Sequence, residues 1–313
     1  MHILYKLYFR SPHTVLDSIK LSGAIIDALM TMYPDRSEEL LEEVISGTFA
    51  VSDAFPFSDL HGYALFPSPA ISYAYPFSDS RESALSQSVG RKDDTKFSTL
   101  DKVRRLCTLY TKNSFRISRN EADEILSKPD ASDGGTDLED DFNEYGVSIN
   151  NDGSTEVYVR ELAFHGNFKF RRGMGIVSDP LWFVLESGSA MFRSALPFLK
   201  DRGISGMITR GKGAFHFEEK DCDFSIGFSD PGYYLLLSPL IPGENEIKSI
   251  DLEMSRYNFG LFSGRNRNAE PIGKYRYFRT GSILYLSNPV RGIAVQVSGE
   301  RVISFKPLMV RVA

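Results

Sequence analysis

The residues best suited to chemistry lie in one short segment that is rich in glycine and carries two cations. It runs from Gly203 to Phe217 and reads GISGMITRGKGAFHF. Glycine accepts positive φ angles and lets a ligand approach the backbone, so that exposed amide groups become hydrogen-bond donors. The segment therefore predicts a binding site for a polyanion. Its candidate binding residues are Gly203, Gly206, Arg210, Gly211, Lys212 and Gly213.

The same segment partly matches a nucleotide-binding P-loop. Gly206, Gly211 and Lys212 reproduce the G-x-x-x-x-G-K spacing. A P-loop needs Ser or Thr at the next position to hold magnesium, and a helix should follow, whereas Gly213 leads into a strand-like stretch. A nucleotide site is therefore disfavoured. Two interpretations stay open: a clamp for the phosphates of a polyanion, and a turn that only joins two elements.

A second cationic segment reads KFRRGMG from Lys169 to Gly175 and combines three cations with an aromatic ring. This composition suits a phosphate contact to a single strand, although solvated surface charge has the same appearance. We take Arg171 and Arg172 as further candidate RNA contacts. A similar mixture of cations and tyrosines spans residues 265–279.

Side chains for metal binding or catalysis are scattered. No two of the five histidines stand at the spacing of metal ligands, and paired carboxylates such as Asp140 and Asp141 have no base or nucleophile beside them. We therefore expect no metal, no cofactor and no catalytic site. The histidines are His2, His13, His61, His165 and His216.

Composition indicates a globular protein of ordinary type. The 313 residues, 42% of them hydrophobic, are enough for a sizeable core and favour two domains. No apolar run approaches the roughly 20 residues of a membrane helix, and the N-terminus lacks a signal-peptide core, so we expect a cytoplasmic protein. Two cysteines, Cys107 and Cys222, suit a reducing compartment. Residues 1–150 carry a net charge of −9 and residues 151–313 one of +4.

The hydrophobic pattern predicts an α+β protein. A strand at residues 2–10 precedes helices at 21–33 and 37–45, and strands at 48–53 and 63–66 follow, which is half of a ferredoxin-like unit. A further helix is expected at 99–110. A second series of strand, helix, glycine-rich loop and strand is expected at 181–185, 190–199 and 214–217, and more strands at 233–237, 258–262, 274–278 and 282–286.

Two features are expected between these series. Residues 128–144 are polar and strongly acidic, and we interpret them as a mobile insertion. Residues 147–149 and 156–164 flank the turn residues Asn150 to Gly153, which predicts a projecting β-hairpin. The expected architecture is two ferredoxin-like, RRM-like modules, at residues 1–150 and 151–313, with this acidic insertion and hairpin.

Several segments taken together resemble the RAMP superfamily of CRISPR ribonucleoproteins, and within it subunit four of the type III-A (Csm) effector complex. The glycine-rich loop occupies the place of the superfamily's own glycine-rich loop. The similarity covers most of the chain outside residues 73–150. The segments that carry it are Ser11 to His13, Gly47 to Ser52, Ala54 to Phe57, Leu65 to Pro69, Tyr233 to Ser238, Tyr257 to Arg265, Phe278 to Ile283 and Gly292 to Val297.

The resemblance implies a non-catalytic subunit that grips the repeat-derived 5′ handle of the guide RNA. It also implies docking to the large polymerase-like subunit and to the backbone subunit. His13, Ser22 and Gly23 match the family's first loop after strand one and would line the same RNA channel. Two alternatives stay open: a metal-independent RNA-processing endonuclease that uses His13 or His61, and a purely architectural docking protein.

Overall fold

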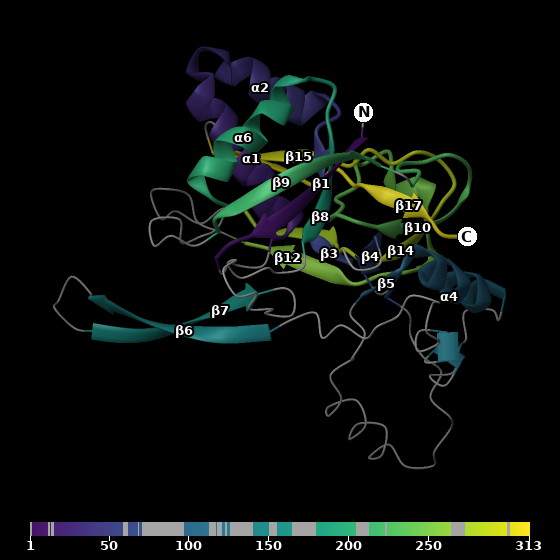
Figure 1. Ribbon diagram of the computed structural model, residues 1–313. Coiled ribbons are helices and arrows are strands. Elements are labelled where there is room, and N and C mark those ends of the chain that lie inside the picture. Colours follow the sequence, from purple (N-terminus) through teal and green to yellow (C-terminus); the bar gives the residue numbers. More distant parts are fainter. Residues whose placement is uncertain are drawn as a thin grey trace.

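A computed structural model gives the architecture of the chain (Figure 1). It describes residues 2–11, 13, 16–58, 62–67, 69–70, 97–112, 117, 121–122, 124–125, 140–149, 155–164, 180–204, 213–222, 224–263, 273–298 and 301–313.

The largest sheet has seven antiparallel strands and includes the N-terminal strand. Its order is β5-β4-β3-β8-β1-β9, and β2 also pairs with β8. Strand β1 is buried on both faces and β9 lies at an edge. The strands are β1 (His2–Phe9), β2 (Ala50–Val51), β3 (Phe55–Ser58), β4 (Tyr63–Pro67), β5 (Phe97–Thr99), β8 (Leu181–Glu186) and β9 (Phe215–Asp221).

Helices cover one face of this sheet, as Figure 1 shows for α1, α2 and α6. Helix α1 begins after Asp17, whose carboxylate accepts a hydrogen bond from the backbone N–H of Lys20 at 2.8 Å and so caps the helix. Apolar residues of β1 and β8, such as Tyr5 and Phe183, pack between sheet and helices. The helices are α1 (Ser18–Met32), the short 3₁₀ turn η1 (Pro34–Arg36), α2 (Ser37–Ser46) and α6 (Met191–Arg202).

The first module is assembled from two distant parts of the chain. In the sheet register, Tyr5 of β1 lies opposite Phe183 of β8 on one side and Glu219 of β9 on the other. The series β8-α6-β9, expected to open a second module, therefore completes the ferredoxin-like unit that β1-α1-β2 begins. The expected boundary at residue 150 does not follow the sheets, because strand pairing across such a distance leaves no local signal in the sequence.

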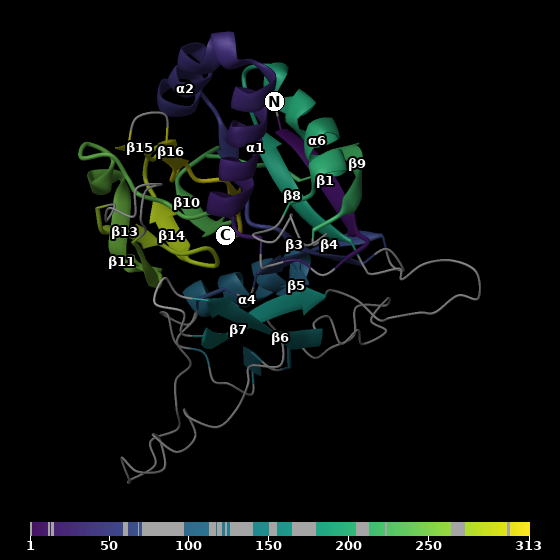
Figure 2. The ribbon, with the colours of Figure 1, turned by 90° about the vertical axis from the view of Figure 1, so that its left-hand side faces the viewer.

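A second antiparallel sheet packs against the other face of the first (Figure 2). Trp182 of β8 is fully buried in a cluster that also contains Leu235 and Val310 of the second sheet. Its indole N–H donates to the carbonyl oxygen of Leu65 at 2.9 Å. The strand order is β11 (Ile250–Arg256), β14 (Ile283–Leu286), β10 (Gly232–Leu236) and β17 (Met309–Arg311), with the 3₁₀ turn η3 (Ile247–Ser249) before β11.

The described residues also include three two-stranded hairpins and one outer helix. One hairpin is β12 (Phe259–Phe262) with β13 (Tyr275–Phe278), and another is β15 (Ala294–Ser298) with β16 (Arg301–Ser304). The helix expected at 99–110 is α4 (Leu100–Lys112).

The predicted long hairpin is present as β6 (Asp140–Ile149) and β7 (Thr155–Phe164), with Ile149 opposite Thr155. Figure 1 shows it outside both sheets. Strand β6 begins at Asp140, so residues 140–144, expected to belong to a mobile insertion, pair with β7 instead. Residues 128–139 lie outside the described part of the chain.

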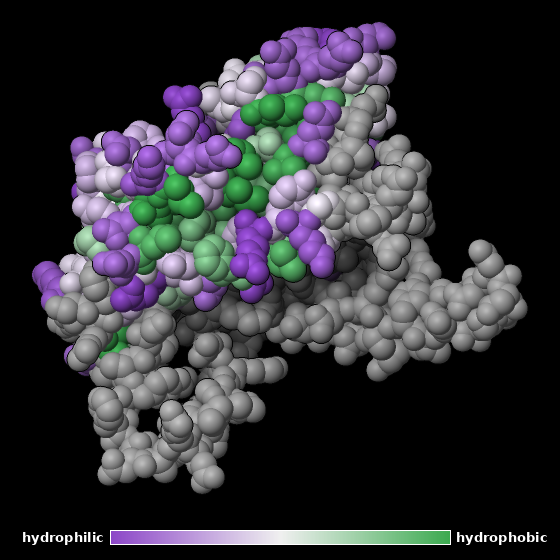
Figure 3. Space-filling view, turned by 180° about the vertical axis from the view of Figure 1, so that it is seen from behind, coloured by the Kyte–Doolittle hydropathy of each residue, from purple (hydrophilic) through white to green (hydrophobic). Residues whose placement is uncertain are grey.

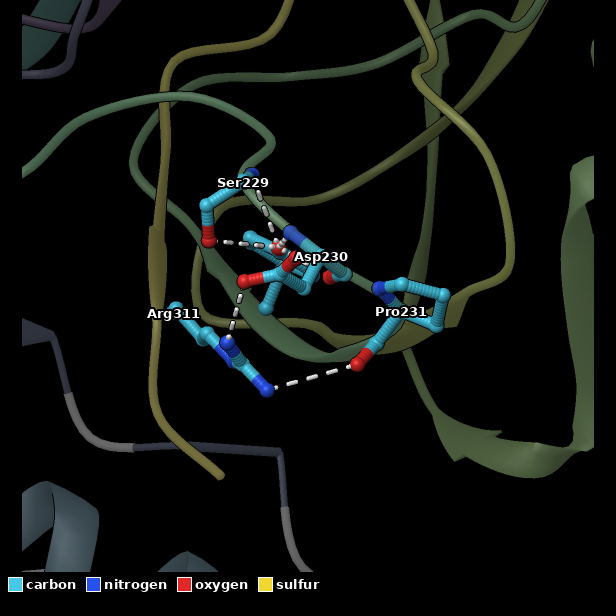
Figure 4. A network of polar contacts seen from close by, with 5 residues as sticks. Ser229, Asp230, Pro231 and Arg311 are labelled. Atoms are coloured by element: carbon cyan, nitrogen blue, oxygen red, sulfur yellow. Dashed lines mark hydrogen bonds and ion pairs between the residues drawn. The ribbon is translucent and has the colours of Figure 1, made fainter.

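A network of polar contacts stabilises the turn before β10 (Figure 4). The hydroxyl of Tyr234 donates to the carbonyl oxygen of Asp230 at 2.6 Å and accepts from the backbone N–H groups of Ser229 and Asp230. Arg311 of β17 adds an ion pair with the Asp230 carboxylate at 3.2 Å. The hydroxyl of this one tyrosine thus supplies hydrogen-bond partners to two backbone N–H groups and one carbonyl oxygen of the turn.

Another buried polar contact caps the C-terminal end of helix α2. The ammonium group of Lys306 donates to the carbonyl oxygens of Val44 and Gly47, at 2.8 and 2.6 Å. These carbonyls lie at the end of the helix, where a positive charge is favoured. None of the described helices is long and apolar enough to cross a membrane.

Candidate nucleic-acid interface

The two ends of the glycine-rich loop are hydrogen-bonded to each other where the loop leaves the fold. Gly203 ends helix α6 with φ +91°, and its N–H donates to the carbonyl oxygen of Leu199 at 2.6 Å. The next N–H, that of Ile204, donates to the carbonyl oxygen of Gly213 at 3.0 Å. Gly213 itself has φ +75°. Both glycines therefore adopt backbone angles that other residues rarely take, as the sequence predicted for this segment.

The centre of the loop, residues 205–212, lies outside the described residues. The predicted roles of Gly206, Arg210, Gly211 and Lys212 therefore stay predictions. The same holds for Arg171 and Arg172 and for His61 and His165.

The root of the loop meets the end of the N-terminal strand. The N–H of Ala214 donates to the hydroxyl oxygen of Ser11 at 2.9 Å, and the N–H of Arg10 donates to the carbonyl oxygen of Ala214 at 2.8 Å. These bonds extend the pairing of β1 with β9. The segment after strand one and the glycine-rich loop, which we expected to line one channel, therefore leave the sheet at the same place.

His13 lies close to this root but inside the protein. Its ring stands 4.0 Å from that of Phe9, which also contacts Phe215 at the start of β9. The side chain is only 1% exposed. A general acid or base must reach the proton that it transfers, so this burial favours a packing role over catalysis.

Ser22 and Gly23 lie within helix α1 and not in a loop after strand one. The Ser22 hydroxyl is buried and donates to the carbonyl oxygen of Ile19 at 3.1 Å. A Cβ atom added at Gly23 would have no neighbour within 4 Å, so packing within the described part of the chain does not require a glycine here. The resemblance matched these two residues to a loop, but both lie within the helix that the hydrophobic pattern predicts from residue 21, and the Asp17 cap starts that helix before them.

Sequence reasoning missed an aromatic pair beside the loop root. Tyr8 of β1 lies opposite His216 of β9, and their rings stack with centroids 4.6 Å apart. Burial lowers the pKa of His216, and the charges of Arg10 and Lys200 lower it further against the opposing effect of Glu218. The lowered pKa favours the neutral imidazole. No local pattern reveals this pair, which is separated by more than two hundred residues.

Within the described ranges, no group of three or more His, Cys, Asp or Glu side chains lies close enough to hold a metal ion. Neither cysteine forms a disulfide: Cys107 is buried, and the half-buried thiol of Cys222 donates a hydrogen bond to the carbonyl oxygen of Phe224 at 3.3 Å.

The fold of this chain is similar to that of several solved structures. The chain superimposes on a structure of the "Csm3-Csm4 subcomplex in the type III-A CRISPR-Cas interference complex" with a TM-score of 0.58, 15% identity and 99% coverage of both chains. Two structures of the Csm1-Csm4 cassette, one with AMPPNP and one with pppApA, give TM-scores of 0.53 and 0.52 at 16% and 17% identity. They cover 100% and 99% of this chain and 98% of their own. The sequence matches no protein-family model and no curated protein.

The fold of this chain is thus the α+β fold found in these solved structures. Csm4 is the subunit that all three solved structures share, and the fold of this chain is Csm4-like over its full length. The resemblance found in the sequence is confirmed at the level of the fold.

Proposed function

We propose that this chain is a non-catalytic, RNA-binding subunit of a type III-A CRISPR effector complex, and that it grips the 5′ handle of the guide RNA. The observation that carries the proposal is the root of the glycine-rich loop. The Ile204 to Gly213 hydrogen bond closes a loop that contains Arg210 and Lys212, next to the end of β1. Amides and cations presented from such a loop suit the phosphates of a single strand.

The partners in this proposal are the large polymerase-like subunit and the backbone subunit of the effector. The similar solved structures contain Csm4 with Csm1 and with Csm3, which supports two docking surfaces on this chain. Figure 3 shows an apolar band across the face opposite to that of Figure 1, flanked by polar side chains. Exposed apolar area of this kind supports protein contacts. Among the residues that the structure describes, the large exposed apolar side chains are Ile45, Ile247, Leu252, Phe259, Leu261 and Ile293.

The test is RNA binding by the assembled complex. Arg210→Glu with Lys212→Glu should weaken binding of handle-bearing guide RNA about tenfold or more at physiological salt, and should flatten the dependence of log affinity on log salt by roughly 1.4. Lys248→Glu with Arg291→Glu makes the same charge change at two exposed cations of the second module and serves as the matched control. Equal affinity of wild type and loop variant would remove the loop from the RNA site.

The absence of catalysis is tested separately. The purified chain, incubated with repeat RNA without metal, should leave the RNA intact. Cleavage that disappears in His13→Ala or His61→Ala would replace this proposal with the endonuclease alternative.

A further inference from the structure

The ring pair Tyr8–His216 lies on the face of the first sheet that faces away from helices α1 and α6. Side chains alternate along a strand, and Tyr5 and Leu7 of β1 pack into the helix-covered core. Tyr8 therefore points to the opposite face, and so does His216 between Phe215 and Phe217, which contact that core. The two rings stand across from each other with an angle of 10° between their planes.

The pair lies at the margin of the sheet. Strand β9 is the last strand in the sheet order, so within the described residues no further strand of this sheet flanks the outer face of the His216 ring. Both side chains are partly exposed. Within the described part of the chain, the stack of two rings therefore ends at the edge strand of the sheet.

The charges around the pair suit a nucleotide. Arg10 is exposed and follows Tyr8 by two positions, which puts it on the same face of the extended chain. The nearby acidic groups already have partners: Glu218 accepts from the Tyr8 hydroxyl at 3.2 Å, and Glu219 pairs with Arg193 at 3.6 Å on the other face. Arg10 and Lys200 lie close enough to affect the titration of His216.

One further observation concerns the His216 ring itself. Its Nδ1 atom is buried and has no hydrogen-bond partner among the described residues. A buried nitrogen without a partner is a cost, so hydrogen bonding at Nδ1 does not explain a histidine here. The contact that the ring does make is the flat stack on Tyr8.

From this arrangement we infer that Tyr8 and His216 form a stacking platform for one unpaired base of a bound RNA strand, with Arg10 beside the phosphate of that nucleotide. The inference rests on the proposed RNA-binding function and adds a base-contacting subsite to it. Stacking accepts any base, because every base has a π face. A strand gripped by the glycine-rich loop would reach this platform directly, since the loop root adjoins β1 and β9 at Ala214.

The experiment uses the assembled complex and guide RNAs that carry the fluorescent base 2-aminopurine at successive handle positions. One position should be quenched by stacking in the wild type. Tyr8→Leu and His216→Leu should abolish the quench at that position and weaken binding about tenfold to a hundredfold, with an unchanged salt dependence because no charge is lost. Tyr8→Phe and His216→Phe keep a flat ring and should keep the quench.

Two outcomes overturn the inference in distinguishable ways. If the wild type binds RNA and the leucine variants bind and quench equally, the platform is refuted and the proposed function stands. If the wild type binds no guide RNA, both the platform and the proposed RNA-binding function fail.

Ultraviolet crosslinking of the wild-type complex, with mass spectrometry, supplies a readout that needs no variant to fold. A nucleotide attached at Tyr8 or His216 supports the platform, whereas crosslinks found only elsewhere refute it.

Discussion

The backbone N–H of Ile204 donates a hydrogen bond to the carbonyl oxygen of Gly213 at 3.0 Å, so the candidate RNA-binding loop begins and ends at one point of the fold. Beside that point, Ser11 accepts a hydrogen bond from Ala214. The loop is thereby anchored to strand β1, which is paired with β8 on one side and with β9 on the other.

Gly213→Ala should destabilise the protein by about 1–2 kcal/mol, because φ +75° is a strained angle for any residue with a Cβ atom. It should also weaken binding of the guide RNA by distorting the loop root. Gly23→Ala is the matched control: the site is an exposed helix position with free space, and alanine there should stabilise by about 0.5–1 kcal/mol. Urea unfolding measures both, and equal effects of the two substitutions would contradict the assignment of strain to Gly213.

Tyr234→Phe should lower the free energy of unfolding by about 1–3 kcal/mol, because two backbone N–H groups and one carbonyl of the turn lose their partner. Asp230→Asn removes only the ion pair with Arg311, whose side chain is 44% exposed, and should cost less than about 1 kcal/mol. Chemical denaturation of both variants separates the two contributions. A larger loss in Asp230→Asn would mean that the ion pair and not the hydroxyl holds this turn.

Lys306→Met should cost roughly 2–3 kcal/mol, because the carbonyl oxygens of Val44 and Gly47 would be left buried without their donor. Methionine has a similar length, so the change tests the hydrogen bonds more than the packing. Lys248→Met, at an exposed lysine, should stay within about 0.5 kcal/mol of the wild type. Unfolding curves that show the same midpoint for both variants would argue against Lys306 as the cap of helix α2.

Asp53 should make stability depend on pH. Burial, helped by the charge of Asp17, raises the pKa of Asp53 from 3.8 to about 6, although its oxygen accepts from the Ser18 N–H at 2.7 Å. At a pH between these two values, Asp53 is therefore still protonated in the folded state, whereas it has already lost its proton in the unfolded state. The contribution of this group is fully present below the unfolded value of 3.8 and is lost as the pH rises through about 6.

The variant Asp53→Asn keeps the acceptor for Ser18 and cannot ionise. Its stability relative to the wild type should therefore increase by roughly 2–3 kcal/mol between pH 4 and pH 7. Unfolding in urea at the two pH values gives this difference, in which the titration of all other groups cancels. A difference that does not change with pH would show that Asp53 titrates alike in both states.

Local patterns predicted most elements of the fold. The apolar spacing around Ile25 and Leu29 identified helix α1, and the turn residues after Ile149 identified the β6–β7 hairpin. Strands β3, β5, β11, β15, β16 and β17 were missed. They are short or carry exposed residues, as in the pattern of β11, where Asp251, Leu252 and Glu253 are all exposed. A strand of that kind is defined by its pairing partner more than by its own side chains.

The candidate site, like the fold, could be predicted from the sequence only in part. Glycines and cations between Gly203 and Gly213 marked the loop without any structure, because positive φ and positive charge are properties of single residues. The burial of His13 was not visible, because it depends on what packs above it. The resemblance matched Ser22 and Gly23 to a loop, although the hydrophobic pattern already predicted a helix from residue 21.

The sequence alone therefore determined the α+β class, the hairpin and the glycine-rich, cationic loop, since each depends on neighbouring residues. Only the tertiary structure decided that β8, α6 and β9 complete the module begun by β1, and that Tyr8 meets His216. Both facts depend on the register between strands that are distant along the chain. That register is decided by how the whole sheet buries its two faces, and no single segment encodes it.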